Sequence, residues 1–204
     1  PRKKTSDIRL LDKKEQLCLE EYVSKIHNST TLGITLAMTT GIRIGELCAL
    51  QWKDIDLEKR ILTVSKTVQR IQLHEADRKT KLIITEPKSE SSKRIIPIPE
   101  AVVAFLKEMR ENDEDFVVSG TSRVIEPRTM QYRFAKILKN VNLPSVHFHA
   151  LRHMFASNCI RLGFDIKALS EILGHSSVEI TLNRYVHSSF EQKTEYMNRI
   201  TICV

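Results

Sequence analysis

Residues 148–187 concentrate side chains that suit chemistry on a phosphate group. In this segment Arg152 follows His149 by three residues, and Tyr185 follows His175 by ten. A guanidinium group stays charged and can donate two parallel hydrogen bonds to an oxyanion, and an imidazole can exchange protons near neutral pH. The combination indicates a site that binds a phosphate group, which the packing of a helical hairpin does not require.

A metal site is the alternative reading of the same segment. His149 and His153 are four residues apart and fall on one face of a predicted helix. Metal sites of this kind add a third, often acidic, ligand at a fixed spacing, and the segment offers none. We therefore predict no metal, and we assign no role to His147 or His153.

Composition indicates an ordinary globular protein with a polyanionic partner. The chain has 204 residues, of which 32 are Lys or Arg and 25 are Asp or Glu, so its formal net charge is +7. This excess favours nucleic acid, although it also serves solubility. The four cysteines lack CxxC spacing and are expected to be reduced thiols. The sequence has no apolar run of about 18 residues, so it predicts no membrane span, and no signal peptide is visible.

The elements that must position these side chains follow from periodicity. Residues 1–12 are predicted to be a basic interdomain linker, and the opening "PRKK" suggests a fragment whose N-terminal partner domain is missing. Apolar residues at helical spacing, with proline starts and glycine or proline stops, predict helices. The predicted helices span residues 13–27, 30–40, 44–52, 99–112 and 127–144, followed by three between 148 and 187 that divide at Gly163 and Gly174.

A change of period predicts strands in the middle of the chain. Residues 60–73 and 81–99 are rich in Ile, Val and Thr. We predict a small antiparallel sheet of about three strands, a hairpin turn around Pro87–Ser92, and a loop over residues 74–81. The expected fold class is α+β and mainly α-helical, with the sheet inserted after the first third of the chain.

Ordered motifs make the chain similar to a known family. "HALRH", then "LGH", then a tyrosine resemble the signature of the tyrosine recombinase (phage integrase) family. Upstream, "TTGIRIGELCALQWKDID" resembles the first arginine box of that family, and "EPKSESSKRIIPIP" its lysine-bearing β-hairpin. The match runs in order from about Thr31 to His187. The resemblance implies a catalytic domain over residues 13–187 and a C-terminal tail over 188–204 that docks on a neighbouring protomer.

The resemblance implies a site and a reaction that needs no metal, ATP or other cofactor. The tyrosine attacks a DNA phosphodiester, forms a 3′-phosphotyrosyl link and releases a 5′-hydroxyl, and a second hydroxyl reverses the step on a new strand. The implied catalytic residues are Arg43, Lys88, His149, Arg152, His175 and the nucleophile Tyr185, with Glu46 in support.

Each implied role suits its residue type. Arg43 and Arg152 would hold the non-bridging oxygens, and Glu46 would orient a neighbouring cation. A phenol has a reference pKa of about 10, so Tyr185 needs a base, and the surrounding cations are expected to favour its phenolate. His149 is the expected base, and His175 would donate a hydrogen bond to the phosphate. Lys88 would protonate the leaving 5′-oxygen, with Lys81, Lys93 and Arg94 as alternatives.

The implied partners are double-stranded DNA, further copies of the chain in a tetramer on DNA, and possible accessory DNA-bending or directionality proteins, with no membrane. The implied location is the cytoplasm of a prokaryote, at the nucleoid. Two other functions remain open: a type IB topoisomerase-like relaxing enzyme, and a non-catalytic regulator that reads DNA through a helix–turn–helix within residues 154–187.

Overall fold

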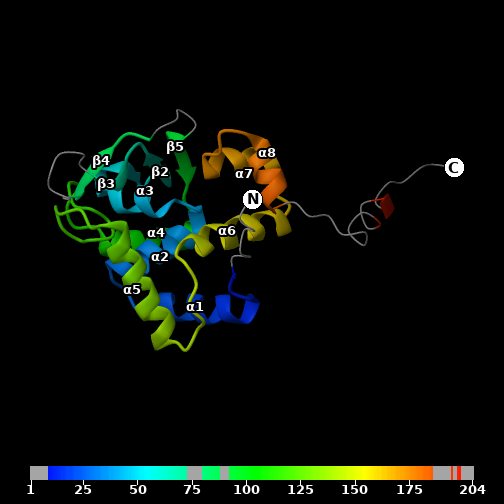
Figure 1. Ribbon diagram of the computed structural model, residues 1–204, viewed down its shortest axis with the longest axis horizontal. Helices are drawn as coiled ribbons and strands as arrows, with labels where there is room; N and C mark the ends of the chain where they lie inside the picture. The colour runs from blue at the N-terminus through cyan, green and yellow to red at the C-terminus, as the bar shows by residue number, and fades with distance from the viewer. Residues whose placement is uncertain (1–8, 73–79, 88–91, 186–193, 195–196, 199–204) are drawn as a thin grey trace.

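The computed structural model describes residues 9–72, 80–87, 92–185, 194 and 197–198. The fold is α+β and mainly helical, as predicted, with short antiparallel strands between the third and fourth helices (Figure 1). The helices are α1 (Lys13–Lys25), α2 (Ser29–Thr40), α3 (Ile44–Ala49), α4 (Glu100–Met109), α5 (Pro127–Asn140), α6 (His149–Arg161), α7 (Ile166–Leu173) and α8 (Val178–Tyr185), with a 3₁₀ turn at Trp52–Asp54.

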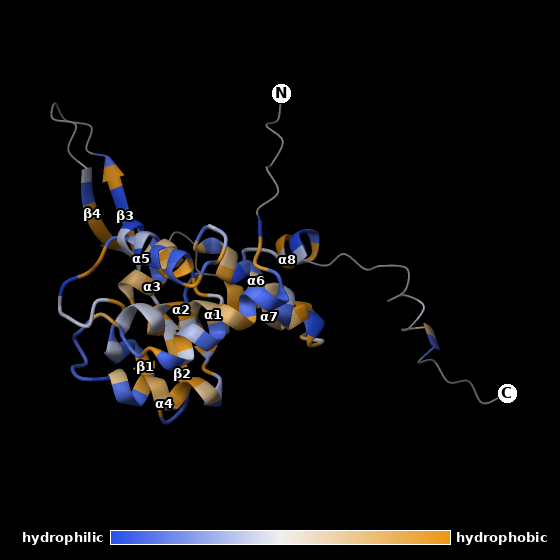
Figure 2. Cartoon of the chain, turned by 90° about the horizontal axis from the view of Figure 1, so that it is seen from below, coloured by the Kyte–Doolittle hydropathy of each residue, from blue (hydrophilic) through white to orange (hydrophobic). Residues whose placement is uncertain are grey.

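The strands form two sheets. A three-stranded antiparallel sheet has the order β1 (Ile55–Asp56), β2 (Ile61–Val64), β5 (Arg94–Pro97), and β3 (Thr67–Gln72) pairs with β4 (Thr80–Thr85). The predicted hairpin turn around Pro87–Ser92 is therefore wrong, because the strands that flank it lie in different sheets. The β3–β4 pair stands out from the body (Figure 2).

Burial explains why β5 pairs with β2 rather than with β4. In the β2–β5 register Leu62 lies opposite Ile96, and both side chains are buried in the core. Alternation along a strand sends every second side chain to the same face, so this pairing places apolar residues of both strands against the helices. The pairing also brings the first residue of β5, Arg94, next to the helical end described below.

Helix α2 is the central element of the main core, as its apolar sequence predicted. Its residues Leu32, Ile34 and Leu36 are fully buried, and it contacts α1, α4, α5 and α6. Asn28 caps its start by accepting hydrogen bonds from the backbone N–H groups of residues 30 and 31. Gly41 ends it in the left-handed conformation, with φ of 64°.

Helices α6, α7 and α8 form a smaller second core, defined by the buried residues Phe155, Ala156, Cys159, Leu169 and Leu173. The predicted divisions at both glycines are confirmed, since Gly163 and Gly174 adopt φ of 79° and 64°. Asp165 caps α7 by accepting from the N–H of residue 168. In Figure 1, α7 lies between β5 and α8, and α6 runs beneath them.

Two of the composition-based predictions are tested by the described residues. Cys18, Cys48 and Cys159 are free thiols, as expected, and Cys203 lies outside the described residues. Among the helices of the described residues, none combines the length and the apolar character needed to cross a membrane.

The end of α2 generates a stability prediction. A methyl group at Gly41 would lie 2.5 Å from Cδ1 of Phe155 and 2.9 Å from Cδ2 of Leu173, whereas one at Gly163 would meet nothing within 4 Å. Both residues have positive φ, so each alanine carries about 1 kcal/mol of backbone strain. Gly41→Ala adds overpacking of about 1–3 kcal/mol. Urea unfolding should show a clearly larger loss for Gly41→Ala than for Gly163→Ala, and equal losses would contradict the packing described.

Candidate active site

Three arginines converge on the C-terminal end of α7. The carbonyls of residues 172, 173 and 174 accept hydrogen bonds from Arg94 Nε at 2.6 Å, Arg152 Nη2 at 2.6 Å and Arg43 Nη2 at 2.7 Å, respectively. The last carbonyls of a helix have no intrahelical partners and carry partial negative charge. The helix end therefore suits guanidinium groups, and it gathers them from β5, from α6 and from the residue before α3. We call Arg43, Arg94 and Arg152 the arginine cluster.

Glu46 is the buried counter-ion of this cluster, with a side chain only 4% exposed. Its carboxylate accepts from both terminal nitrogens of Arg94, at 2.9 and 3.1 Å, and from Arg43 Nη1 at 2.8 Å. Burial alone would raise the pKa of Glu46, but the hydrogen bond and charge of Arg94, with the charge of Arg43, lower it overall. Glu46 is thus a carboxylate that orients two of the three arginines.

Arg152 links α6 to the ends of α2 and α7. It lies on α6, is 2% exposed, and donates through Nη1 to the carbonyl of Gly41 at the end of α2, at 2.7 Å. Burial, with the charge of Arg43, lowers the pKa of Arg152 to about 9, which leaves it charged at neutral pH. Arg43 is more accessible, with 35% of its side chain exposed.

The two histidines of the predicted site are neutral. Desolvation, followed by the charges of neighbouring groups that include Arg152 and Arg43, lowers the pKa of both His149 and His175 to about 4. His175 Nδ1 lies 2.8 Å from the hydroxyl of the buried Thr181 on α8. The ring of His149, at the start of α6, lies edge-on to that of His153 with centroids 4.8 Å apart.

Tyr185 ends α8 and packs against the second core of its own chain. Its ring lies parallel to that of His175, with centroids 6.4 Å apart. Burial raises the pKa of Tyr185 more than the charges of Arg152, Arg184 and Arg43 lower it. The arginine charges thus favour the phenolate, as expected, but desolvation of the phenol outweighs them, so the pKa of Tyr185 is raised overall.

The predicted lysine, Lys88, lies outside the described residues. Of its alternatives, Arg94 is buried against Glu46, with a side chain 6% exposed, and Lys93 forms an ion pair with Glu86 at 2.8 Å. Lys81 lies on β4 with an exposed side chain. The structure thus brings together the other six predicted residues and adds Arg94 as a structural member of the cluster.

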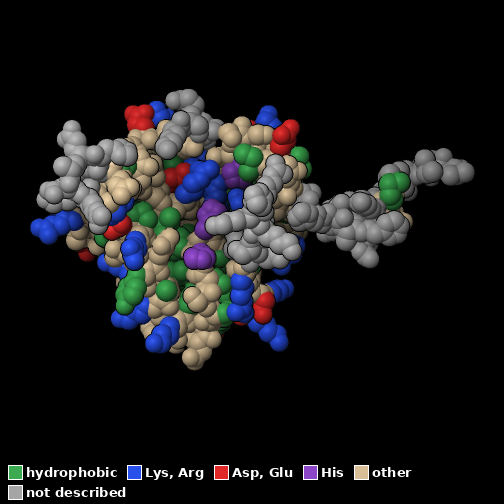
Figure 3. All heavy atoms as spheres, viewed as in Figure 1, with side chains coloured by type: hydrophobic (Ala, Val, Ile, Leu, Met, Phe, Trp, Pro, Cys, Tyr) green, Lys and Arg blue, Asp and Glu red, His purple; other side chains and the backbone are tan. Residues whose placement is uncertain are grey.

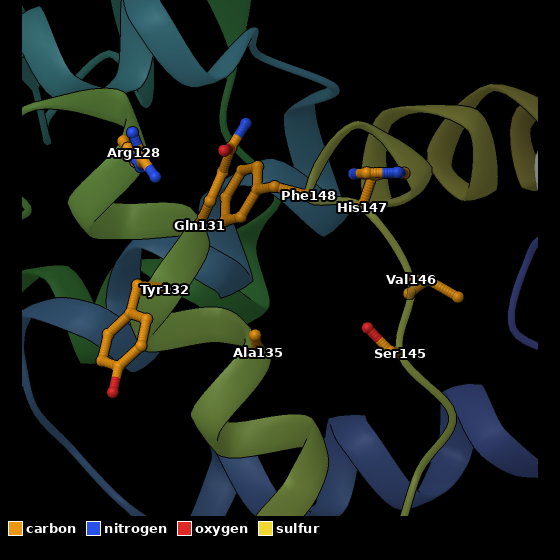
Figure 4. Close-up of a pocket in the computed structure, with 8 residues that line it drawn as sticks. All are labelled: Arg128, Gln131, Tyr132, Ala135, Ser145, Val146, His147 and Phe148. Carbon is orange, nitrogen blue, oxygen red and sulfur yellow. The ribbon is translucent and has the colours of Figure 1, made fainter.

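Basic and histidine side chains gather near the middle of one face, with an acidic side chain beside them (Figure 3). A separate hollow of about 290 Å³ lies between α5 and residues 145–148, and none of the predicted catalytic residues lines it (Figure 4). His147 and Tyr132 line this hollow, and Tyr132 is 74% exposed. Within the described part of the chain, no group of three or more His, Cys, Asp or Glu is placed to hold a metal ion.

The fold is that of the class of tyrosine recombinase catalytic domains. The chain belongs to the phage integrase family, whose sequence profile matches residues 9–192. A XerC-like tyrosine recombinase of Caldanaerobacter subterraneus subsp. tengcongensis is 34% identical over 178 residues, which cover 78% of this chain and 46% of that protein. The transposase of transposon Tn916 from Enterococcus faecalis is 28% identical, over 93% of this chain and 50% of that protein. The chain thus spans about half the length of these curated relatives.

Solved structures of integrases have a similar fold. The integrase of transposon Tn1549, in complex with transposon right-end DNA, superposes with a TM-score of 0.76 at 25% identity, over 98% of this chain and 68% of that one. The catalytic domain of the bacteriophage HP1 integrase shares the fold at 19% identity, with a TM-score of 0.58 and coverage of 93% of this chain and 95% of that one.

Two residues contribute more to the site than their motifs indicate. Arg94 is predicted only as an alternative to Lys88, and His153 has no predicted role. The available signal for Arg94 is a charged residue at the start of an apolar strand pattern, "RIIPIP". The signal for His153 is its spacing of four from His149, which indicates a contact between two rings as readily as metal ligation.

The buried carboxylate generates a second prediction. Glu46→Gln removes the charge that faces Arg94 and should lower the free energy of unfolding at pH 7 by about 3 kcal/mol, because a buried cation loses its partner. The same change in the exposed Lys53–Glu114 pair, Glu114→Gln, should leave the free energy of unfolding almost unchanged, because solvent screens an exposed pair.

The pH dependence of this difference follows from the lowered pKa. The stabilisation by Glu46 is complete above its ordinary pKa of 4.5 and is lost as the pH falls below that value through the pKa of the folded protein. Denaturant unfolding of wild type and Glu46→Gln should therefore differ most at neutral pH and converge in acid. A difference that stays constant down to pH 3 would contradict a charged Glu46.

Proposed function

We propose that the chain is the catalytic domain of a site-specific DNA recombinase or integrase that cleaves and rejoins DNA strands through a 3′-phosphotyrosyl intermediate. The observation that carries this proposal is the arginine cluster at the end of α7, with Tyr185 of the same chain beside His175. Its support includes family membership, the names of the recombinase and transposase relatives, and the DNA bound in the Tn1549 integrase structure.

The arginines are the proposed phosphate clamp. The hydrogen bonds of Arg152 to the carbonyls of residues 41 and 173 use two of its five N–H donors, and those of Arg43 to Glu46 and Gly174 likewise use two. The remaining donors are available to the non-bridging oxygens of a phosphodiester. Because both groups are already fixed, they stabilise developing negative charge without reorganisation at the moment of reaction.

The remaining side chains move protons in the proposed reaction. The Tyr185 oxygen bonds to phosphorus as the bond from phosphorus to the 5′-oxygen breaks. His149, neutral at pH 7, accepts the phenolic proton, and Lys88 protonates the leaving oxygen. With His175 Nδ1 accepting from the hydroxyl of Thr181, Nε2 carries the proton and donates to the phosphate. In rejoining, a 5′-hydroxyl attacks phosphorus, and the protons return.

The proposal includes the wider assembly. Its partner is double-stranded DNA, on which the chain forms a tetramer, with possible accessory DNA-bending or directionality proteins, in the cytoplasm of a prokaryote at the nucleoid. Residues 13–187 are the catalytic domain, residues 1–12 are a linker, and the tail at 188–204 docks on a neighbouring protomer. Sedimentation of the chain on a recombination-site duplex tests the assembly, and only monomers at saturating protein would contradict the tetramer.

Covalent capture from a library of DNA duplexes tests the reaction. The chain is incubated with randomised duplexes, each nicked so that the cleaved strand diffuses away, and adducts that survive detergent are isolated and sequenced. Wild type should yield adducts with one recurrent sequence, and Tyr185→Phe none. Tyr22→Phe, a partly buried tyrosine of α1, is the matched control and should react like wild type.

The proposed phosphate clamp predicts that adducts form more slowly in the same capture assay when one of its arginines is removed. Arg43→Ala should slow adduct formation on the order of 100- to 1,000-fold, because one preorganised donor is lost. DNA retention should change little, since it depends on many phosphate contacts. Adducts that persist in Tyr185→Phe would overturn the nucleophile assignment. Sequence-specific binding without any adduct would favour the regulator, and relaxation of supercoils without two-site recombination would favour the topoisomerase.

A further inference from the structure

His153 is a buried polar residue that the proposed mechanism does not use. It follows Arg152 on α6 and is 7% exposed. Its Nε2 atom is shielded from solvent and has no hydrogen-bond partner among the described residues. A buried nitrogen that has lost water without gaining a partner is unfavourable, so such an atom in a native protein indicates a function or a partner in another arrangement.

The hydroxyl of Tyr185 is also buried without a hydrogen-bond partner within the described part of the chain. Its ring is a direct neighbour of the His153 ring, with centroids 5.5 Å apart and planes inclined by 57°. The only other unpaired buried side-chain atom among the described residues is Oγ1 of Thr35, on α2. Two of three such atoms thus belong to one pair of neighbouring rings.

The two atoms are chemically complementary. A phenol donates one hydrogen bond, and the unprotonated nitrogen of a neutral imidazole accepts one. Burial first, and then the charges of Arg184 on α8 and Arg152 on α6, lower the pKa of His153 and keep it neutral. His149 also faces this ring, and its own lowered pKa makes it neutral as well. In the tautomer of the neutral ring whose proton is on Nδ1, Nε2 of His153 is an acceptor.

We propose that His153 is a positioning residue for Tyr185, whose hydroxyl donates a hydrogen bond to its Nε2 atom. The two unpaired atoms belong to adjacent rings, so one hydrogen bond between them would satisfy both. The bond holds the phenol beside His175 of the same chain. Because the O–H points toward α6, the oxygen lone pairs point away from α6 before a phosphate engages them. The description of Tyr185 as a nucleophile rests on the proposed function, whereas the hydrogen bond itself does not.

The role differs from that proposed for His149. His149 is more exposed than His153, although desolvation still lowers its pKa, whereas His153 is enclosed between His149 and Tyr185. An enclosed neutral imidazole suits orientation of a hydroxyl, and an accessible one suits proton transfer. Arg184 is the exposed cation nearest in sequence to the phenol, and it repels a proton from His153.

Nitrogen NMR of the DNA-free chain tests the hydrogen bond directly. Long-range proton–nitrogen correlation at pH 7 reports which imidazole nitrogen carries the proton, and loss of one signal set in His153→Gln assigns His153. The expected result is a proton on Nδ1 and an unprotonated Nε2 whose signal moves in Tyr185→Phe. A proton on Nε2, or an Nε2 signal that Tyr185→Phe leaves in place, would overturn the proposal.

Adduct formation tests the consequence for the reaction. At saturating DNA recovered from the capture experiment, His153→Phe should slow adduct formation about 10- to 100-fold, since an orienting hydrogen bond is lost. His153→Gln keeps an acceptor and should restore the rate to within about fivefold of wild type. Thr35→Val, which removes the remote unpaired hydroxyl, is the matched control and should react like wild type.

The outcomes separate the two proposals. His153→Phe reacting at the wild-type rate, or His153→Gln as slow as a folded His153→Phe, would reject the positioning role while wild-type adducts keep the proposed function intact. Absence of adducts from wild type would reject the proposed function, and the NMR result would still decide the hydrogen bond. Thermal unfolding establishes that each variant is folded. If His153→Phe does not fold, the NMR comparison in wild type and Tyr185→Phe decides.

Discussion

The structure depends on how α7 ends. A helix that stops at Gly174 leaves the carbonyls of residues 172–174 without intrahelical partners, and each takes a guanidinium from a different part of the chain. Two features favour glycine at position 174: its φ is 64°, and a Cβ would lie only 3.0 to 3.1 Å from side-chain atoms of Arg94. The end of α2 contributes in the same way, through the carbonyl of Gly41. Two helix ends thus fix charges that would otherwise repel one another.

The charge balance at the end of α7 influences the protonation of the other groups in the site. One buried carboxylate, Glu46, offsets the arginine cluster only in part. Desolvation, followed by the remaining positive charge, keeps the nearby histidines neutral, and burial keeps Tyr185 protonated. The site of the DNA-free protein therefore has an excess of positive charge around a neutral phenol. A phosphodiester would supply the missing negative charge, so binding and activation are expected to be coupled.

The sequence predicted the helical framework because its signals are local. Apolar spacing, Pro127 at a helix start, and glycines at helix ends each act within a few residues, and the structure has them where they were predicted. Strand pairing was predicted less well, since a hairpin at Pro87–Ser92 and the observed β2–β5 pairing are equally compatible with strand-forming residues. Only burial of Leu62 and Ile96 against the helices distinguishes them.

In the candidate site, too, local motifs were informative and contacts between distant segments were not predicted. Ordered motifs pointed to residues such as Arg43, Arg152 and Tyr185, which the fold brings together. Motifs could not predict the net effect of burial on the Tyr185 pKa, nor that Arg94 shares Glu46 and the end of α7, because both depend on contacts between distant segments. A role for His153 cannot be predicted for the same reason, since its unpaired atom exists only once α8 packs on α6.

The most direct test of the central claim is a crystal structure of the chain with duplex DNA and orthovanadate, which adopts the geometry of a phosphoryl transition state. We predict that Arg43 and Arg152 donate to vanadate oxygens while both keep their hydrogen bonds to the carbonyls of residues 173 and 174, with the Tyr185 oxygen bonded to vanadium. Vanadate bound away from the end of α7, or arginines that must leave those carbonyls to reach it, would contradict the claim.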